Sequence, residues 1–280
     1  TEANGPSSEF VADTLYPKEE PRPQSVDLRE GDLLGLRAGF GAFEAEREAS
    51  FFSTGGLAAV HSFGRDRNAI WDGLQRKETY GTSGDRILLW FDLVSESSII
   101  PMGGSVETSS NPVFRVKAVG AFEQKPGCPD YSSTNISDQE IERICKNECY
   151  NPSDKRKLIT RIEVVKVTPQ TYRGENVDSL ISDPWKIINC EPSQQGCDVE
   201  FTDEEFSVDS RDASYYVRAI QEPSPAVNAE NLRCTYDEEG NCVKVNICYG
   251  DNRTAREDDC LMLSEERAWS SPIYLNYYNL

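Results

Sequence analysis

The sequence contains a single histidine, His61, among its 280 residues. Metal centres built from several imidazole ligands need more than one histidine. The residues of this chain alone therefore exclude a histidine-rich centre with several metals, to which His61 could contribute only if the site is completed elsewhere. The sequence also lacks any apolar run near the ~20 residues that a membrane helix requires, which predicts no membrane insertion.

Basic residues are scarce as well. The chain has 29 lysines and arginines against 48 carboxylates, a formal net charge of −19. Such a charge disfavours nucleic acids and anionic membrane surfaces as partners. Solubility is the plain explanation of the excess carboxylates, and cation binding is the alternative.

The first 30 residues are rich in proline and carboxylates, with Pro17, Pro21 and Pro23 close together. This composition predicts an extended arm rather than an element with its own core. No basic-then-apolar signal peptide precedes it, and the chain starts at Thr1, so we expect a processed or truncated N-terminus.

All nine cysteines lie between Cys128 and Cys260. Paired C-x-x-C spacing, which zinc sites use, is absent, so the sequence favours disulfides and an oxidising compartment. Because nine is odd, we expect one thiol outside the intrachain pairs, among Cys128, Cys145 and Cys149. The remaining candidates have spacings that suit short loop staples: Cys190 and Cys197, Cys234 and Cys242, and Cys248 and Cys260.

A strand, helix, turn and strand are predicted around residues 57–94. Leu57–Val60 is a short apolar run, Asp66 is placed to cap a helix that carries Ile70, Trp71 and Leu74 on one face, and 79–84 contains two glycines. A strand then alternates from Arg86 to Val94. With a helix expected at 42–52, this is an α/β pattern, typical of a parallel sheet with crossover helices.

The signals from Arg86 onward are those of a β domain. Alternation or strand-forming composition predicts strands, with a short helix at 138–145 capped by Ser137 and a bulge at Val164–Val165. The expected strands are 114–118, 158–167, 185–188, 199–201, 215–221 and 271–277, with a hairpin in 234–248 that turns at 239–241. Several strands with cystine-pinned loops indicate an antiparallel sandwich.

The pattern A-V-H-S-x-G-R-x-R-x-A-I-W-x-x-L-x-R-x-E-x-Y-G-T-S-G-x-R-I, from Ala59 to Ile87, resembles a family of exported bacterial proteins. That family is related to the PHP (polymerase and histidinol phosphatase) metal-dependent phosphoesterases. Residues 215–221 and 266–274 resemble the same family. The resemblance implies an α+β chain: residues 31–85 would be the C-terminal strand-helix part of a PHP-like α/β barrel, and 86–280 a disulfide-stapled antiparallel β-sandwich of fibronectin-like type.

The resemblance also implies a function. We expect the C-terminal portion of a secreted, periplasmic or cell-surface bacterial metal-dependent hydrolase, of phosphoesterase type. Its divalent metal ligands would come mostly from an N-terminal PHP-like segment or partner chain, and the isolated chain would be inactive. The alternative is a non-catalytic binding or assembly module of a secreted or cell-surface complex, which could form an oligomer.

The candidate site residues lie around the predicted turn at 79–84. His61 follows an apolar strand, where α/β folds gather functional side chains. The site would include Arg76, Tyr80 and Arg86 as catalytic candidates and Thr82 and Ser83 as anion-binding residues, since hydroxyls and guanidinium groups bind oxyanions. In the competing interpretation, His61 satisfies backbone groups, the glycines shape a turn, and Arg86 pairs locally.

Two acidic loops are candidates for calcium, which takes oxygen ligands from flexible loops. They contain Asp237, Glu238, Glu239 and Asn241 in the first and Asp251, Asp258 and Asp259 in the second. Neither has the spacing of an EF-hand, and solvated loops are the alternative.

Overall fold

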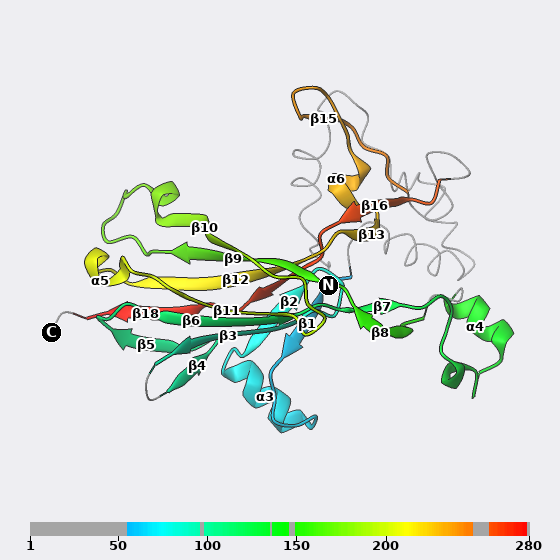
Figure 1. Ribbon diagram of the computed structural model, residues 1–280, viewed down its shortest axis with the longest axis horizontal. Helices are drawn as coiled ribbons and strands as arrows, with labels where there is room; N and C mark the ends of the chain where they lie inside the picture. The colour runs from blue at the N-terminus through cyan, green and yellow to red at the C-terminus, as the bar shows by residue number, and fades with distance from the viewer. Residues whose placement is uncertain (1–54, 96–97, 135, 146–148, 249–257, 279–280) are drawn as a thin grey trace, which may run out of the picture. The chain divides into compact units, whose positions relative to one another are not determined.

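The computed structural model describes residues 55–95, 98–134, 136–145, 149–248 and 258–278 (Figure 1). The described chain divides into two units: residues 56–222 with 266–280, and residues 223–265 with Gly55. The expected arm at 1–30 and the expected helix at 42–52 lie outside the described residues.

The first unit contains an eight-stranded sheet. Six of its strand pairs are antiparallel, and one pair, between the last strand and an early one, is parallel. Its strands are β1 (Leu57–Val60), β2 (Thr79–Thr82), β5 (Ser105–Thr108), β9 (Ile159–Val167), β10 (Ile181–Asn189), β12 (Ala213–Gln221), β17 (Arg267–Ser270) and β18 (Ile273–Tyr277). Strand β12 pairs with β9 along one side and with β17 and then β18 along the other.

The second sheet of this unit has four antiparallel strands. They run in the order β11 (Cys197–Thr202), β6 (Val113–Val119), β3 (Leu88–Val94) and β4 (Ile99–Pro101). Strands β3 and β6 alternate strictly between buried and more exposed residues, as expected for strands that cover a core on one face only.

The two sheets pack face to face around one apolar core (Figure 1). Phe114 on β6 lies between its neighbours Phe91 and Phe201 and contacts Tyr215 on β12, with ring centroids 4.8 Å apart. All of these residues are buried, so they remove a large aromatic area from water and join the two layers. The antiparallel β-sandwich expected from the sequence is confirmed.

Shorter elements surround the sandwich. Strands β7 (Phe122–Gln124) and β8 (Pro152–Arg156) form an antiparallel pair, and a long connection joins them. The helical elements of this unit are α3 (Arg67–Gln75), α4 (Asp138–Cys145), α5 (Phe206–Asp209) and the 3-10 helices η2 (Asp130–Thr134) and η3 (Val177–Leu180). As expected, Ser137 Oγ accepts a hydrogen bond from the Glu140 backbone at the start of α4. None of the helices in the described part of the chain is both long and apolar enough to cross a membrane.

The second unit is small over its described residues. It contains two strand pairs and one short helix: β13 (Ser224–Val227) with β16 (Leu261–Ser264), β14 (Thr235–Tyr236) with β15 (Cys242–Lys244), and α6 (Ala229–Arg233). The β14–β15 pair confirms the hairpin expected in 234–248.

The part of the chain that the structure describes contains four disulfides, which use eight of the nine cysteines. They join Cys128 to Cys149, Cys190 to Cys197, Cys234 to Cys242 and Cys248 to Cys260. The three short staples are therefore confirmed, and Cys145 is the cysteine outside these pairs. Such a set of disulfides is typical of proteins that fold in an oxidising compartment.

Three local expectations were wrong. The segment 79–84 is not only a turn: Thr79–Thr82 forms β2, because its backbone pairs with β1 on one side and β17 on the other. Strand β1 is antiparallel to β2, so this region is not a parallel strand-helix-strand unit. The bulge expected at Val164–Val165 lies instead in the neighbouring strand β10, between Ser182 and Lys186.

The pairing of β2 with β17 also bears on domain organisation. It places residues 79–82 in the same sheet as residues 267–270. The boundary expected after residue 85 therefore falls inside the first unit. The structure shows a β-rich chain with few helices, and no part of the described residues forms a barrel of alternating strands and helices.

Candidate functional site

His61 directly follows β1 and connects it to the second sheet. Its Nε2 lies 2.8 Å from the carbonyl oxygen of Leu89 on β3. A carbonyl can only accept, so Nε2 carries the hydrogen and donates. This nitrogen is therefore occupied by the backbone, and Nδ1 is the ring atom that could act on a ligand.

The surroundings of His61 are aromatic. Its ring centroid lies 5.4 Å from that of Tyr80 and 5.7 Å from that of Trp90. Burial raises the pKa of Tyr80, so its hydroxyl stays protonated at neutral pH. His61 belongs to no group of three or more metal-ligating side chains within the described residues. These residues do not fit the multimetal centre of a PHP-type phosphoesterase.

The other candidates around residues 79–84 point to different places. Ser83 Oγ donates to the carboxylate of Glu266 and accepts from the backbone N–H of Arg267, 2.9 Å away, so it ties β2 to β17. Thr82 is buried. Arg76, at the end of α3, donates from Nε to Glu78 Oε1 over 2.7 Å. The structure therefore does not assemble the expected anion site from Arg76, Thr82 and Ser83.

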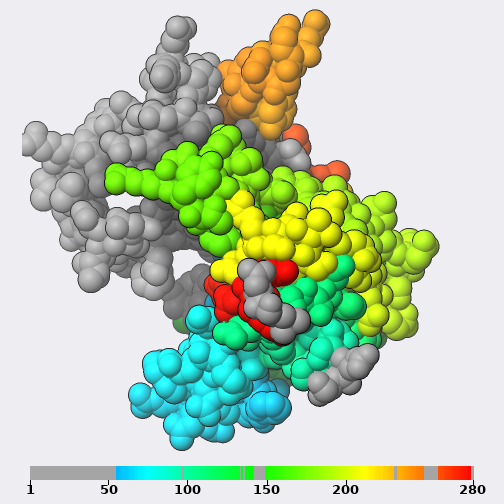
Figure 2. All heavy atoms as spheres, turned by 90° about the vertical axis from the view of Figure 1, so that its left-hand side faces the viewer, coloured from blue at the N-terminus to red at the C-terminus, as the bar shows by residue number. Residues whose placement is uncertain are grey.

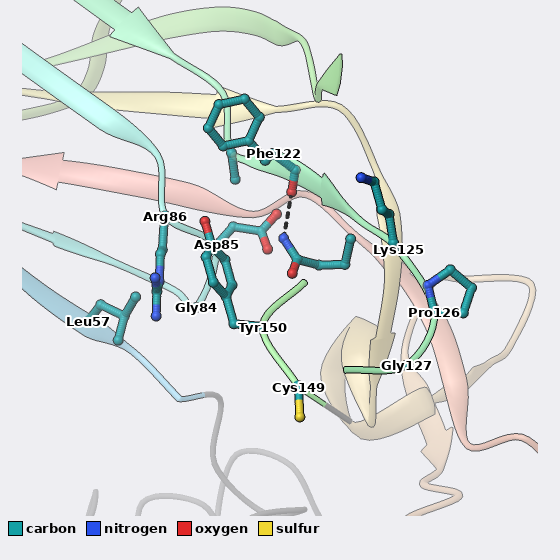
Figure 3. A pocket seen from close by; sticks show the side chains of 12 residues that line it. Leu57, Gly84, Asp85, Arg86, Phe122, Lys125, Pro126, Gly127, Cys149 and Tyr150 are labelled. Carbon is teal, nitrogen blue, oxygen red and sulfur yellow. Dashed lines mark hydrogen bonds between the residues drawn. The ribbon is translucent and has the colours of Figure 1, made fainter. Parts of the chain in front are cut away.

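Arg86 lies in an open cavity of about 670 Å³ on the first unit (Figure 3). Its guanidinium carbon lies 3.8 Å from the ring centroid of Tyr150, which makes a close cation–π contact. Figure 3 shows Arg86 and Leu57 on one side of the cavity and Lys125 on the other, with Tyr150 between them. Phe122 also lines the cavity.

The single carboxylate that lines this cavity, Asp85, is already neutralised. Lys157 Nζ donates to Asp85 Oδ2 over 2.6 Å, and Gln221 Nε2 donates to the same oxygen. Gln221 is fully buried, and its Oε1 accepts from the Ala121 backbone over 2.9 Å. Asp85 is thus held by the sandwich, and the free charges that line the cavity are cationic.

Helix α3 presents an apolar face to solvent. Asp66 Oδ1 caps the helix by accepting from the backbone N–H groups of residues 68 and 69, as expected. The helix packs on β1 through Gly73, where a Cβ would come within 2.5 Å of the His61 carbonyl oxygen. Three apolar side chains of the helix nevertheless keep high exposed fractions: 40% for Ile70, 59% for Trp71 and 44% for Leu74.

Figure 2 shows the residues at the start of the described chain, in blue and cyan, projecting from the strands of the first unit. Phe63, in the loop before α3, is 99% exposed. We call Phe63, Ile70, Trp71 and Leu74 the α3 face. Exposed aromatic and aliphatic side chains gathered on one helix and the loop before it typically mark an interaction surface.

The acidic loops do not form calcium sites within the described residues. Asp237 Oδ1 accepts from the backbone N–H groups of Glu239 and Asn241, and these hydrogen bonds lower its pKa, so its carboxylate shapes its own turn. Glu238 and Glu239 are exposed in this turn, and Asp259 accepts from the backbone of Leu261. Asp251 lies outside the described residues.

One cluster of potential metal ligands is present in the described chain: Cys248, Asp258 and Cys260. Cys248 and Cys260 form a disulfide, so neither is a thiolate. Arg233 NH2 lies 2.8 Å from both oxygens of Asp258, which neutralises that carboxylate. This cluster does not fit a metal ion.

The cavity at Arg86 contains residues that the sequence analysis missed. Lys125, Phe122 and Tyr150 are separated from Arg86 by 36 to 64 positions, and no motif links them. The one usable signal was the cysteine pair: a bridge from Cys128 to Cys149 brings Tyr150 close to the segment that ends at Gly127.

Two comparisons with known proteins found nothing: no curated protein and no solved structure matches the chain. A family model described as a protein of unknown function, DUF3604, matches residues 14–93. The described part of this match contains β1, α3, β2 and most of β3, and therefore both His61 and the α3 face. This stretch of the chain is similar to that family.

Proposed function

We propose that this chain is the C-terminal portion of an exported bacterial PHP-like metal-dependent hydrolase of phosphoester type, and that its α3 face packs against the N-terminal segment or partner chain that carries most of the metal ligands. The observation that supports this proposal best is the α3 face itself. A helix of a globular domain normally buries its apolar stripe, yet α3 packs on β1 through Gly73 and leaves Trp71 outward.

The described residues contain no complete metal site, which also supports the proposal that the metal ligands lie in another segment or chain. The single histidine has one nitrogen engaged with Leu89, and no second imidazole exists in the chain. The metal ligands would therefore belong to an N-terminal PHP-like segment or partner chain. Nδ1 of His61 remains available for an acid–base contribution at the edge of such a site.

The disulfides agree with the proposed compartment. Four bridges in one chain require oxidising conditions during folding, as in the periplasm or outside the cell. A phosphoesterase in that compartment would act on exported or scavenged esters.

The test starts from the protein purified under native conditions from its source. Denaturing intact-mass analysis, metal analysis and hydrolysis of bis(4-nitrophenyl) phosphate are measured on the same material. We expect a histidine-rich polypeptide, either covalently joined or in stoichiometric amount, together with a bound divalent metal and hydrolysis. A lone species of 31.4 kDa without metal or activity would contradict the proposal.

Substitution of Trp71 tests the role of the α3 face. Trp71→Glu is expected to abolish assembly with the histidine-rich part, because a carboxylate would be buried in an apolar contact. Val208→Glu is the control, since Val208 on α5 is an apolar residue that is 81% exposed and lies outside this face. Equal assembly of the two variants would remove the α3 face from the proposal. His61→Ala in the assembled protein should lower hydrolysis if Nδ1 takes part.

The second candidate function is a non-catalytic binding module of a secreted or cell-surface complex. The cavity at Arg86 favours it, since it combines aromatic walls with cationic groups away from the α3 face. Metal content separates the two candidates, because a binding module needs no catalytic metal.

A further inference from the structure

The cavity at Arg86 concentrates unpaired positive charge in a strongly acidic protein. Arg86 and Lys125 both line it, and within the described residues neither side chain forms an ion pair or hydrogen bond. The lining carboxylate, Asp85, is neutralised by Lys157. With a net charge of −19 there are many acidic side chains available to pair with these cations. Two cationic side chains without carboxylate partners at one cavity indicate a binding site for an anion.

The Tyr150 ring lies directly against the Arg86 guanidinium. The guanidinium carbon lies over the ring, 3.8 Å from its centroid, a distance at which a guanidinium can stack on an aromatic face. Stacking uses the face of the guanidinium and leaves its N–H edge available. That edge presents two parallel donors, which match the two oxygens of a carboxylate or phosphate.

The walls that carry these groups are fixed to one another. The Cys128–Cys149 disulfide joins the end of one wall to the residue before Tyr150. Asn151 reinforces the joint: its Nδ2 donates to the carbonyls of Pro126 and Gly127, and its backbone N–H donates to Gln124 Oε1 over 2.8 Å. A cavity fixed in this way binds a ligand without a large ordering cost.

Most of the remaining lining is apolar, and the amide of Gln124 is engaged by the Phe122 carbonyl and the Asn151 backbone N–H. Leu57, Phe122 and Pro126 contribute side chains, and Phe122 is itself covered by the Arg156 guanidinium at 3.7 Å. A volume of about 670 Å³ is within the range of cavities that take small molecules. The ligand would therefore pair an oxyanion with an apolar body rather than be a bare inorganic ion.

We propose that the cavity formed by Arg86, Tyr150, Phe122 and Lys125 is a binding site for a small organic anion, a carboxylate or phosphate carried on an apolar group. Arg86 binds the oxyanion through its free edge, Tyr150 positions Arg86, and Lys125 attracts the ligand from the opposite wall. This proposal does not depend on the hydrolase, since all of its residues lie in the first unit of this chain.

Isothermal titration calorimetry on the intact, disulfide-bonded chain tests the site. The probes are 1-naphthoate and 1-naphthyl phosphate, with the neutral 1-naphthol and inorganic phosphate as controls for the apolar body and for the charge. We expect saturable binding of at least one naphthyl anion, tighter than about 1 mM, and weaker binding of both controls. The ratio of the two anion affinities shows whether carboxylate or phosphate is preferred.

The variants separate the roles of the residues. Arg86→Gln should weaken the bound naphthyl anion about tenfold or more, because a charge-assisted bidentate contact is lost. Arg86→Lys should restore only part of the affinity, since a lysine keeps the charge but not the two-pronged edge. Tyr150→Leu should also weaken binding, through the loss of the ring that holds Arg86. Lys117→Gln is the charge-matched control outside the cavity and should stay within about twofold of the unmodified protein.

Three results would overturn the proposal: no saturable binding of either naphthyl anion at about 1 mM, equal affinity for 1-naphthol, or equal effects of Arg86→Gln and Lys117→Gln. Near-ultraviolet circular dichroism of each variant verifies that the sandwich is intact. None of these results affects the hydrolase proposal, which is judged by companion chain and metal content.

Discussion

Replacing Asp203 with alanine is expected to lower the free energy of unfolding of the sandwich by about 3 kcal/mol, the low end of the range for breaking a buried ion pair. Asp203 is fully buried after β11 and accepts from three groups. These are Lys166 Nζ at 2.7 Å, the Tyr215 hydroxyl at 2.6 Å and the Glu205 backbone N–H at 3.0 Å. Alanine would leave all three without this acceptor.

The low end of that range applies because Lys166 keeps a second partner. Its Nζ also lies 3.1 Å from Asp209 Oδ2, whose side chain is partly exposed. The main cost of the substitution is therefore the buried Tyr215 hydroxyl and the weakened charge balance of Lys166. Tyr215→Phe, which removes one hydrogen bond but leaves Asp203 two donors, should cost less, about 1–2 kcal/mol.

Chemical denaturation at pH 7 with disulfides intact measures these effects. Trp185 is a local reporter, because its ring centroid lies 6.0 Å from that of Tyr215. Asp198→Ala is the matched control: Asp198 forms a 2.6 Å ion pair with Arg115, but both side chains are largely exposed, so its loss should cost about 0–1 kcal/mol. A loss below about 1 kcal/mol for Asp203→Ala would refute the reasoning, since the buried pair would then behave like a surface pair.

The same cluster sets a pH dependence. Burial acts to raise the pKa of Asp203, but hydrogen bonds from Lys166 and Tyr215 outweigh it and lower the pKa below its usual 3.8. A lowered carboxyl pKa gives stability that is present above the unfolded pKa and is lost as the pH falls through the folded pKa. Burial together with Asp203 raises the pKa of Tyr215 above its usual 10.0. Its contribution is therefore present below that value and declines above it. The denaturant concentration at the midpoint of unfolding should be constant between about pH 5 and pH 9. Asp203→Asn should reduce the loss of stability that the unmodified protein shows at lower pH.

Two further predictions concern the disulfides and the close contact of Gly120 with the Lys157 backbone. Thiol titration of denatured, unreduced protein should find about one thiol per chain, and Cys145→Ser should remove it, because the other eight cysteines are paired; nine thiols would contradict the disulfides. Gly120→Ala should destabilise the protein by at least about 2 kcal/mol in the same denaturation assay, because a Cβ there would come within 1.9 Å of the Lys157 carbonyl oxygen. Gly81→Ala is its control, with the nearest atom at 3.8 Å, and equal effects of the two would disprove the steric argument.

Much of the sandwich follows from local patterns in the sequence. Alternation in β3 and β6 predicted which residues face the core, because a strand that is covered on one face must place its apolar side chains two apart. The capping of α3 by Asp66 was also readable, since it depends only on residues two and three positions away. The three short disulfides followed from cysteine spacing for the same reason.

Local sequence patterns did not predict which distant strands pair with each other. Thr79–Thr82 contains two threonines, a tyrosine and a glycine, which fits either a turn or a short strand. It became a strand because β17, almost 190 positions later, offers backbone groups to pair with it. The α/β interpretation of residues 57–94 was wrong at this point, since direction of pairing depends on partners that lie elsewhere in the chain.

By itself, the sequence determined the three short disulfides, the exclusion of a histidine-rich metal centre built from this chain alone, and the β character of the chain after residue 86. Only the tertiary structure decided which side chains meet. Arg86 contacts the ring of Tyr150, whereas Ser83 donates a hydrogen bond to Glu266, so the expected anion site does not form. The tertiary structure also left apolar side chains of α3 exposed, since the helix approaches the His61 backbone at Gly73, where a Cβ would come within 2.5 Å of the carbonyl oxygen. Local spacing fixes the face on which a side chain lies, whereas contacts between faces depend on the packing of the whole chain.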